Sequence, residues 1–510
     1  MRRAERVAFL SIAAVIVYQT MIPPIVSLAN NGDFGKISGH FSIGYPPALE
    51  ARYAPVKWHR EPVYDYHAAF RSSENALAIA AMGLSSLVSK SGEFDIRCIG
   101  AMHAALFLLA LWLLLPVLAP FLPPRARIAI LLAIAFVYCD AMYVAVFNSF
   151  YMDAAALVFV PLTAVFFLRS LLWHRRADLA GFALSSALLA GAKAQHAILA
   201  LPLVFLMIAF RKKIGASVAA IGAAGVIAAA CYAAFSPPPD YGANQWYDVI
   251  FLSVLPYSPA PVQDLAELHL DPADVVYSRT SAYYPTGGFA KREFTKRFKE
   301  RVNGAVLMRF YLHHPVRIFK MLIRAFSDAG RTRPRDLGNF DPAEGFPPFA
   351  RSQAFSEWSG LRAFLFAEHG LRYFLASAGL LVLLVISARG QWRAAAVCLA
   401  IAIALEALVS GLADAAEAPR HFTIFCELQD LSLLALLTAA LRRFALRNRG
   451  GHLGDPDRPR DAEKFQNLQR DPGRIEFVPC QAMPRRGRMR VMVVVPSFAE
   501  GDQRHPPVIS

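Results

Sequence analysis

Four short polar segments interrupt the long apolar runs of this chain, and they carry the residue types that could do chemistry. Residues 30–36 read Asn-Asn-Gly-Asp-Phe-Gly-Lys and residues 148–153 read Asn-Ser-Phe-Tyr-Met-Asp. Residues 191–196 and 414–421 add lysine, arginine, histidine and further acids. Carboxylates can take a proton from a hydroxyl, and cations can hold a phosphate group. Together these segments supply the parts of a group-transfer site.

Asp33 is the first candidate for a catalytic carboxylate. It follows the first apolar run by a few residues, and Gly32 and Gly35 on either side would let the backbone approach a ligand closely. Ionisable residues at a membrane face indicate function when they are not arginine-type anchors. The alternative, given equal weight, is a turn that only terminates the preceding helix.

Asp153 is the second candidate carboxylate. It stands at the start of a later apolar run. An aspartate in the first turn of a helix often acts as a cap that the helix dipole favours, and for Asp153 alone this is the stronger interpretation. Its position on the same membrane face as Asp33 favours a functional role.

Lys193, Arg420 and His421 are candidates for holding a phosphate group. Arginine binds phosphate oxygens through two parallel hydrogen bonds and keeps its charge in any environment. The alternatives are an exposed turn lysine and an internal salt bridge of Arg420 with a nearby acid. Secondary candidates in the same segments are Lys36, Gln195, Asp414 and Glu417.

The elements that must position these residues are membrane-spanning helices. The chain is 56% hydrophobic and 18% charged, which is too apolar for an ordinary soluble protein. A spanning helix needs about 20 apolar residues. We expect an all-α, polytopic helical bundle of about ten transmembrane helices, two of them short. Their expected positions are 7–29, 97–120, 128–147, 154–172, 179–193, 195–210, 214–235, 371–388, 393–413 and 421–441.

The distribution of basic residues predicts the orientation of the bundle. Lysine and arginine mark cytoplasmic turns. Alternate turns are basic, whereas the opposite turns carry almost no such charge apart from Lys193 and Arg420. Both termini are therefore predicted to be cytoplasmic. The net charge of +15 needs no nucleic acid as a partner, since the inner leaflet is anionic. The basic positions are Arg2, Arg3, Arg6, Arg125, Arg127, Arg175, Arg176, Arg211, Lys212, Lys213, Arg389, Arg393, Arg442 and Arg443.

Residues 1–445 are predicted to form one transmembrane domain with two outward helical loops, 30–96 and 236–370. Within the first loop, residues 74–90 are expected to be a helix along the membrane surface, with a short extra span as the alternative. Residues 446–510 are predicted to be a disordered cytoplasmic tail. A less favoured view of residues 1–29 is a cleaved signal peptide. The cysteine spacing supports neither a disulfide framework nor a zinc site.

With these segments in place, the chain resembles the GT-C class of polytopic glycosyltransferases, and within it the bacterial hexose transferases of glycan biosynthesis. Residues 30–36, 147–153 and 414–421 carry the resemblance, and an acid close to the first span is the feature that Asp33 matches. The resemblance covers roughly residues 1–445 in topology. It implies Asp33 as general base and Asp153 as a second acidic site residue.

The resemblance also implies partners and a location. A hexose would pass from a polyprenyl-phosphate-linked donor to a cell-envelope glycan or lipid-linked acceptor at the outer face of a bacterial inner membrane. The first loop has no paired acidic motif, which puts a divalent metal in doubt, and we expect no cofactor. Other expected partners are membrane lipids.

Two other functions fit the same features. A lipid-linked glycan polymerase or ligase would use arginines in the second loop, such as Arg279, Arg292, Arg297 and Arg301. A flippase would also gather ionisable residues in a polytopic fold. Against a transporter, the charges stand at one membrane face and no inverted repeat is visible.

Overall fold

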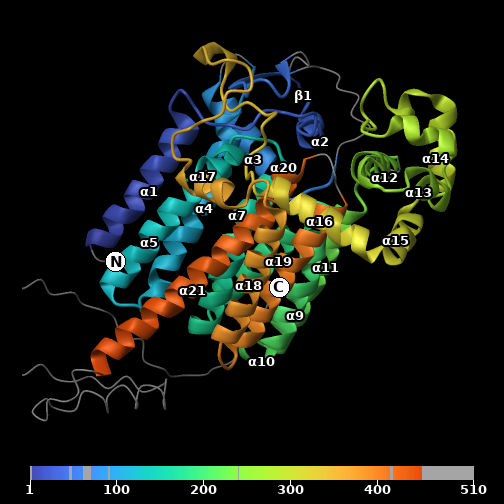
Figure 1. The fold of residues 1–510 in the computed structure, drawn as a ribbon. Helices are drawn as coiled ribbons and strands as arrows, with labels where there is room; N and C mark the ends of the chain where they lie inside the picture. The colour runs from blue at the N-terminus through green and yellow to red at the C-terminus, as the bar shows by residue number, and fades with distance from the viewer. Residues whose placement is uncertain are drawn as a thin grey trace, which may run out of the picture. The chain divides into compact units, whose positions relative to one another are not determined.

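The protein is an all-α polytopic membrane protein in a computed structural model that describes residues 3–44, 49–60, 70–89, 92–238, 240–413 and 417–450 (Figure 1). Within these residues, seven helices are long and apolar enough to cross a membrane. These are α1 (Arg3–Met21), α4 (Arg97–Leu118), α7 (Met152–Trp173), α11 (Ala216–Ala234), α18 (Gly370–Ser387), α19 (Trp392–Leu412) and α21 (Thr423–Gly450).

The other predicted spans are helical but differ from a simple crossing. The third is a pair, α5 (Pro124–Tyr138) and α6 (Ala141–Phe147), which bends by 69° and makes an eighth span if counted as one. The expected short spans are α8 (Arg176–Ala190) and α9 (Ala200–Ala209) with the 3-10 turn η3 (Gln195–Leu199) before it. They have 15 and 10 residues, below the roughly 20 that a crossing needs.

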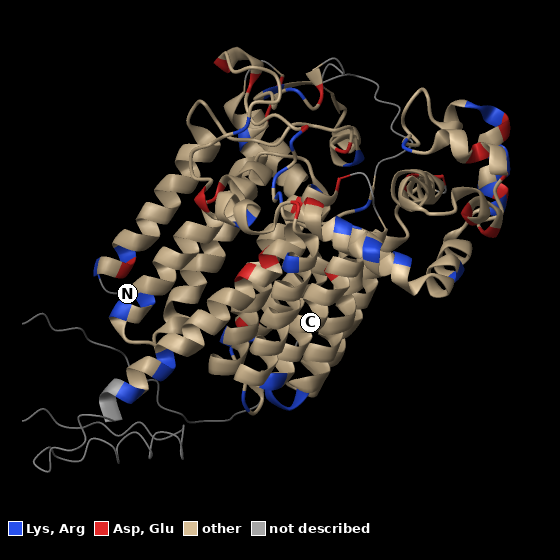
Figure 2. Ribbon diagram, in the orientation of Figure 1, with Lys and Arg blue, Asp and Glu red and all other residues tan. Residues whose placement is uncertain are grey.

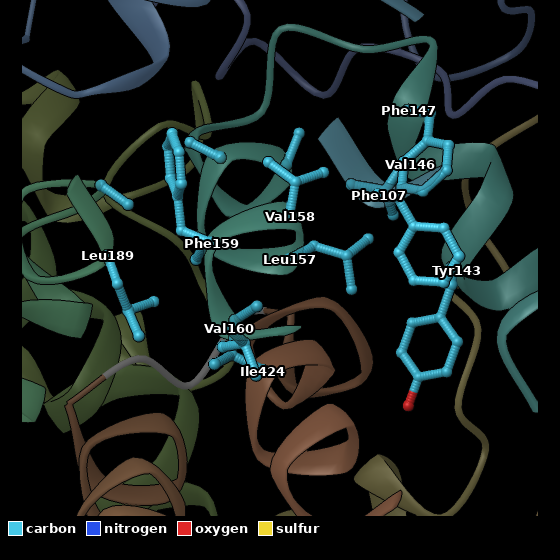
Figure 3. Packing of buried hydrophobic residues seen from close by; sticks show 14 of the residues in the cluster. Phe107, Tyr143, Val146, Phe147, Leu157, Val158, Phe159, Val160, Leu189 and Ile424 are labelled. Carbon is cyan, nitrogen blue, oxygen red and sulfur yellow. The ribbon is translucent and has the colours of Figure 1, made fainter. Parts of the chain in front are cut away.

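Helix α7 is the centre of the bundle. Figure 3 shows its buried residues Leu157, Val158 and Phe159 facing side chains from several other helices. Among these neighbours are Phe107 of α4 and Ile424 of α21. Because α7 is apolar nearly all round, it is stable only when other helices cover it. This packing fixes the position of Asp153, the second residue of α7.

Asn148, which directly follows α6, joins the end of the third span to the end of the first. Its side chain donates hydrogen bonds to the carbonyls of Thr20 at 2.9 Å and Val26 at 3.0 Å. Gly100 of α4 makes room for it, since a Cβ there would meet Asn148 Oδ1 at 1.8 Å. The segments that carry Asp33 and Asp153 are therefore brought to the same end of the bundle.

The first loop contains a small sheet that the sequence did not predict. Strands β1 (Ile43–Gly44), β2 (Lys57–Arg60) and β3 (Phe94–Asp95) pair antiparallel in that order, with Trp58 opposite Phe94. Runs of two to four residues are too short to show an alternating pattern. The helix expected at 74–90 is present as α3 (Glu74–Val88), and its place along the membrane surface stays a prediction. The same loop holds α2 (Gly35–Ser38) and η1 (Gly39–Phe41).

The second loop is helical, as expected, and it also has its own apolar core. Tyr247, Phe251, Phe294 and Phe298 are buried together, with Phe294 and Phe298 stacked at 5.7 Å. The last element of the loop, α17 (Glu357–Phe366), packs against α5 and α18 of the bundle. The elements before it are α12 (Tyr241–Asp248), η4 (Val249–Val254), η5 (Leu255–Tyr257), α13 (Pro261–Glu267), η6 (Pro272–Tyr277), η7 (Gly288–Ala290), α14 (Arg292–Arg301), α15 (Gly304–His313), α16 (Pro315–Ala329) and η8 (Pro342–Glu344).

Charges gather at the two ends of the bundle. Lysine and arginine lie where α1 begins, at α10 (Arg211–Ile214) and along the end of α21, whereas most acids lie towards the other end (Figure 2). This agrees with the alternation of basic turns, and the orientation in the membrane stays a prediction. Of the predicted tail 446–510, residues 446–450 continue helix α21 in place of the expected disorder, while residues 451–510 and Asp414 lie outside the described residues.

Candidate functional site

Arg420 joins the two predicted carboxylates. It lies in α20 (Ala418–His421), directly before α21. Its Nη2 is 2.7 Å from Asp33 Oδ2 and its Nη1 is 3.3 Å from Asp153 Oδ2. A third acid, Glu417, accepts from Arg420 Nε at 2.7 Å. One guanidinium thus bridges three carboxylates from three separate parts of the chain.

Of the two acids that the sequence predicted as catalytic, Asp33 is the more accessible. Its side chain is 21% exposed, against 3% for Asp153. Lys36 Nζ lies 2.6 Å from Asp33 Oδ1 and donates to the Tyr241 hydroxyl at 3.1 Å. Burial alone would raise the pKa of Asp33, but the charges of Lys36 and Arg420 outweigh it and hold that pKa below its ordinary value. Asp33 is therefore ionised at neutral pH.

The turn that presents Asp33 is built by its own residues. Asn30 Oδ1 accepts hydrogen bonds from the backbone amides of Gly32 at 2.8 Å and Phe34 at 3.0 Å. Gly32 has a φ of +101°, a conformation that favours glycine. Phe34 then packs its ring against Tyr151 at 4.7 Å. These contacts fix the direction in which the Asp33 carboxylate points.

Lys193, His421 and Gln195 form the inner side of the site. Lys193 Nζ lies 3.1 Å from Asp153 Oδ1 and 3.2 Å from His421 Nδ1. Gln195 holds this arrangement, since its amide donates to the His421 carbonyl at 3.0 Å. All the described residues predicted for the site therefore meet here.

Two further buried residues of the site, His196 and Glu406, were not predicted from the sequence. His196 Nε2 lies 3.2 Å from Asp153 Oδ1, and its Nδ1 lies 3.1 Å from Glu406 Oε1 of α19. Both side chains are fully buried. His196 stood in a predicted segment, but Glu406 lies within an apolar run. An acid within a spanning helix was the signal that could have identified it.

Asn31 and Tyr151 complete the set. Asn31 donates to Glu417 Oε1 at 2.5 Å and lies 3.0 Å from the Tyr151 hydroxyl, which also donates to the Ala29 carbonyl. The Arg420 guanidinium lies over the Tyr151 ring, 4.7 Å from its centroid. Both residues hold Arg420 and Glu417 in place.

The structure decides between several alternatives that the sequence left open. Lys193 is not an exposed turn lysine, since it is only 6% exposed. Asp153 is more than a helix cap, because its carboxylate binds Lys193, His196 and Arg420. The internal salt bridge of Arg420 with Glu417 is present. Burial among acids explains why two cations break the pattern of basic turns.

Acidic and basic side chains occur in similar numbers at the site. Asp33, Asp153 and Glu417 pair with three basic side chains, and His196 lies between Asp153 and Glu406. These basic side chains are Lys36, Lys193 and Arg420. Among the described residues, no group of three or more histidine, cysteine or acidic side chains is arranged to hold a metal ion. A bound anion would have to compete with carboxylates for these cations.

A family model describes most of the chain. The model of the YfdI N-terminal transmembrane domain matches residues 1–414. The chain belongs to this family. No curated protein and no solved structure matches it. The YfdI match agrees with a polytopic membrane protein. It ends at residue 414, just before Glu417, Arg420 and His421, which complete the site. The YfdI-type region therefore contains Asp33, Asp153 and Lys193, while Arg420 comes from the chain beyond it.

The arginines of the second loop are arranged differently. Arg297 Nη2 lies 2.5 Å from Asp274 Oδ1, within the loop itself. In the described part of the chain, none of the four arginines of that loop named above forms an ion pair with Asp33, Asp153 or Glu417. No contact of these arginines therefore favours a polymerase or ligase over a transferase.

The buried Glu406–His196 contact gives a prediction about stability. Glu406→Leu removes one of the two buried acids that His196 contacts, so we expect a loss of about 3–5 kcal/mol in the free energy of unfolding. Glu406→Gln, which keeps a hydrogen-bond acceptor for His196, should cost less than half as much. Thermal unfolding in detergent measures both. Equal losses for the two variants would show that charge, and not hydrogen bonding, decides.

The Asp33–Lys36 pair gives a prediction about pH. Burial lowers the pKa of Lys36, but Asp33 outweighs that effect and raises it above its ordinary 10.5, while the pKa of Asp33 lies below its ordinary 3.8. The acid contributes stability that is lost only as pH falls through its lowered pKa, and the lysine contribution is lost only as pH rises through its raised pKa. The unfolding temperature of wild type minus that of Asp33→Asn should thus stay constant from about pH 5 to 9 and fall below about pH 4. A steady change between pH 5 and 8 would contradict a lowered pKa.

Proposed function

We propose that this protein transfers a hexose from a polyprenyl-phosphate-linked donor to a glycan or lipid-linked acceptor. The observation that carries the proposal is the bridge that Arg420 makes between Asp33 and Asp153 at one end of a membrane bundle. Asp153 is the second residue of the spanning helix α7, so the site lies where the apolar part of the bundle ends. A lipid-linked substrate presents its phosphate at this depth. The predicted orientation makes this the outer face of the inner membrane.

The donor phosphate would bind to Arg420 and Lys36. Their partner Asp33 is the more exposed of the two catalytic candidates, and Lys36 is itself 14% exposed, so a ligand can approach from this side. Arginine offers two parallel donors to a phosphate, and lysine adds a single charge. Negative charge grows on the departing phosphate during transfer, and fixed cations stabilise it.

Phosphate binding would also change Asp33. The charges of Lys36 and Arg420 hold the pKa of Asp33 below its ordinary value, which makes it a weak base. A phosphate that shares Arg420 and Lys36 would weaken this hold and raise the basicity of Asp33. The carboxylate would thus become a competent base when the donor is in place.

The transfer step itself is a substitution at the anomeric carbon. The acceptor hydroxyl oxygen forms a bond to that carbon while its proton passes to Asp33, and the bond from the carbon to the phosphate oxygen breaks. The electron pair of that bond leaves with the polyprenyl phosphate. An oxocarbenium-like transition state of this kind depends on electrostatic placement. The step as written uses only the side chains named, with no cofactor.

Asp153, Lys193 and His421 would position the reacting groups. Asp153 is buried and binds Lys193 and Arg420 at once, so it fixes the distance between these two cations. Lys193 and His421, 3.2 Å apart, are the deeper candidates for phosphate contacts. The membership of a transmembrane YfdI family supports a membrane protein of glycan metabolism.

The deciding experiment uses purified protein in lipid vesicles with a radiolabelled polyprenyl-phosphate hexose. Label recovered in an acceptor supports the transferase. Label that only moves between leaflets, with no transfer product, would replace the proposal with a flippase. Heat-treated protein in matched vesicles measures spontaneous lipid movement.

A further inference from the structure

A second basic feature lies at the opposite end of the bundle from Arg420. A cavity of about 890 Å³ lies among α1, α4, α5 and α7, lined by Arg6, Arg127 and Arg169 together with Glu5 and an apolar wall. Arg169 stands 16 positions after Asp153 on α7. At 1.5 Å per residue, this places the cavity about 24 Å from the carboxylate site along the helix. The two sites are therefore distinct.

The arginines of this cavity are only partly neutralised. Arg127 Nη2 lies 2.7 Å from Glu5 Oε1, while its buried Nε has no hydrogen-bond acceptor among the described residues. Arg169 Nε lies 2.6 Å from Asp178 Oδ1. The exposed Arg6 forms no ion pair within the described chain. Three guanidinium groups thus face two acids, and the exposed guanidinium of Arg6 remains available to an anion.

The wall of the cavity is apolar and continues onto the outer surface of the bundle. Trp112 and Pro116 of α4 line it, and Trp112 is 49% exposed. On α1, the neighbours of Arg6 along the helix include Val7 and Leu10, which are 57% and 62% exposed. Exposed apolar side chains on a spanning helix face acyl chains. Tryptophan prefers the boundary between acyl chains and headgroups.

We propose that this cavity binds the phosphate headgroup of an anionic membrane lipid. Arg127 and Arg6 would hold the phosphate, and an acyl chain would lie along Trp112. Basic pockets between spanning helices are known places for anionic headgroups. A soluble anion would use the arginines but not the apolar wall, so the wall favours a lipid. The proposal does not depend on the transferase function.

The test measures lipid binding by the full chain in detergent. Phosphatidylglycerol is titrated into purified protein, and its binding is followed by the rise in unfolding temperature. We expect wild type to bind it, and Arg127→Gln and Arg6→Gln each to weaken binding by about fivefold. Arg6→Gln breaks no ion pair, so it keeps the test informative if Arg127→Gln folds poorly. Lys212→Gln, an exposed lysine of α10 outside the cavity, is the matched control.

Three outcomes would overturn the proposal. Equal weakening by Lys212→Gln would mean general attraction to basic residues. Inorganic phosphate that binds as tightly as phosphatidylglycerol would indicate a soluble anion site. Phosphatidylcholine that binds as tightly would show that the charge of the headgroup does not matter.

Quenching of Trp112 by brominated phosphatidylglycerol, absent in Trp112→Phe, would place the lipid in this cavity.

Discussion

Asp33→Asn is expected to reduce hexose transfer by about 10²- to 10⁴-fold, the usual contribution of a general base, while the protein stays folded in the membrane. The change replaces one oxygen by nitrogen at nearly constant volume and removes the basicity. It also removes a competitor of the donor phosphate, since Asp33 pairs with both Lys36 and Arg420. Donor affinity should therefore stay the same or increase while turnover falls.

This combination separates a base from a structural ion pair. Binding of labelled donor and single-turnover transfer are measured on the same preparation. A variant with full transfer activity would remove Asp33 as the base. A variant that loses donor binding and turnover together would make Asp33 a structural partner of Arg420. Asp240→Asn is the matched control, because Asp240 is an exposed acid paired with Lys299 in the second loop.

Arg420→Lys is expected to weaken donor binding by about 10- to 100-fold, equivalent to one or two charge-assisted hydrogen bonds. Lysine keeps the charge but has no planar fork, so it cannot bridge Asp33, Asp153 and Glu417 while holding a phosphate. Equilibrium binding of the labelled donor measures the effect. Unchanged affinity would leave Arg420 a purely structural residue.

Arg331→Lys controls for the loss of a bridging arginine as such. Arg331 pairs with Asp328 at 2.7 Å and also with Glu368, but in the second loop and away from the carboxylate site. It should leave donor affinity unchanged. A loss in both variants would indicate a general effect on folding.

The sequence predicted the positions of the helices and of most of the site because both depend on local patterns. Apolar runs of spanning length identify helices directly, and Asp33, Asp153, Lys193 and Arg420 stand out as charges between them. The sequence alone indicated only that these four residues share one membrane face. Their pairing depends on distances across the bundle, which no spacing along the chain records.

The residues and elements that the sequence missed are of a different kind. Glu406 is buried in α19 and acts through His196, and only a contact between two helices gives it a role. The sheet of the first loop consists of strands of two to four residues. Length also separates α8 and α9, with 15 and 10 residues, from the seven described helices that are long enough to cross a membrane. Tertiary packing decides the role of Glu406 and the pairing of the strands.

The place of Arg420 near the end of the transmembrane chain affects how the protein can be made. Arg420 follows Asp33 by 387 positions, and of the site residues only His421 is synthesised after it. At about 5–20 residues per second, Asp33 waits on the order of 20–80 seconds for this partner. During that time the early helices carry acids that lack their guanidinium. The site can therefore close only after α20 has been synthesised.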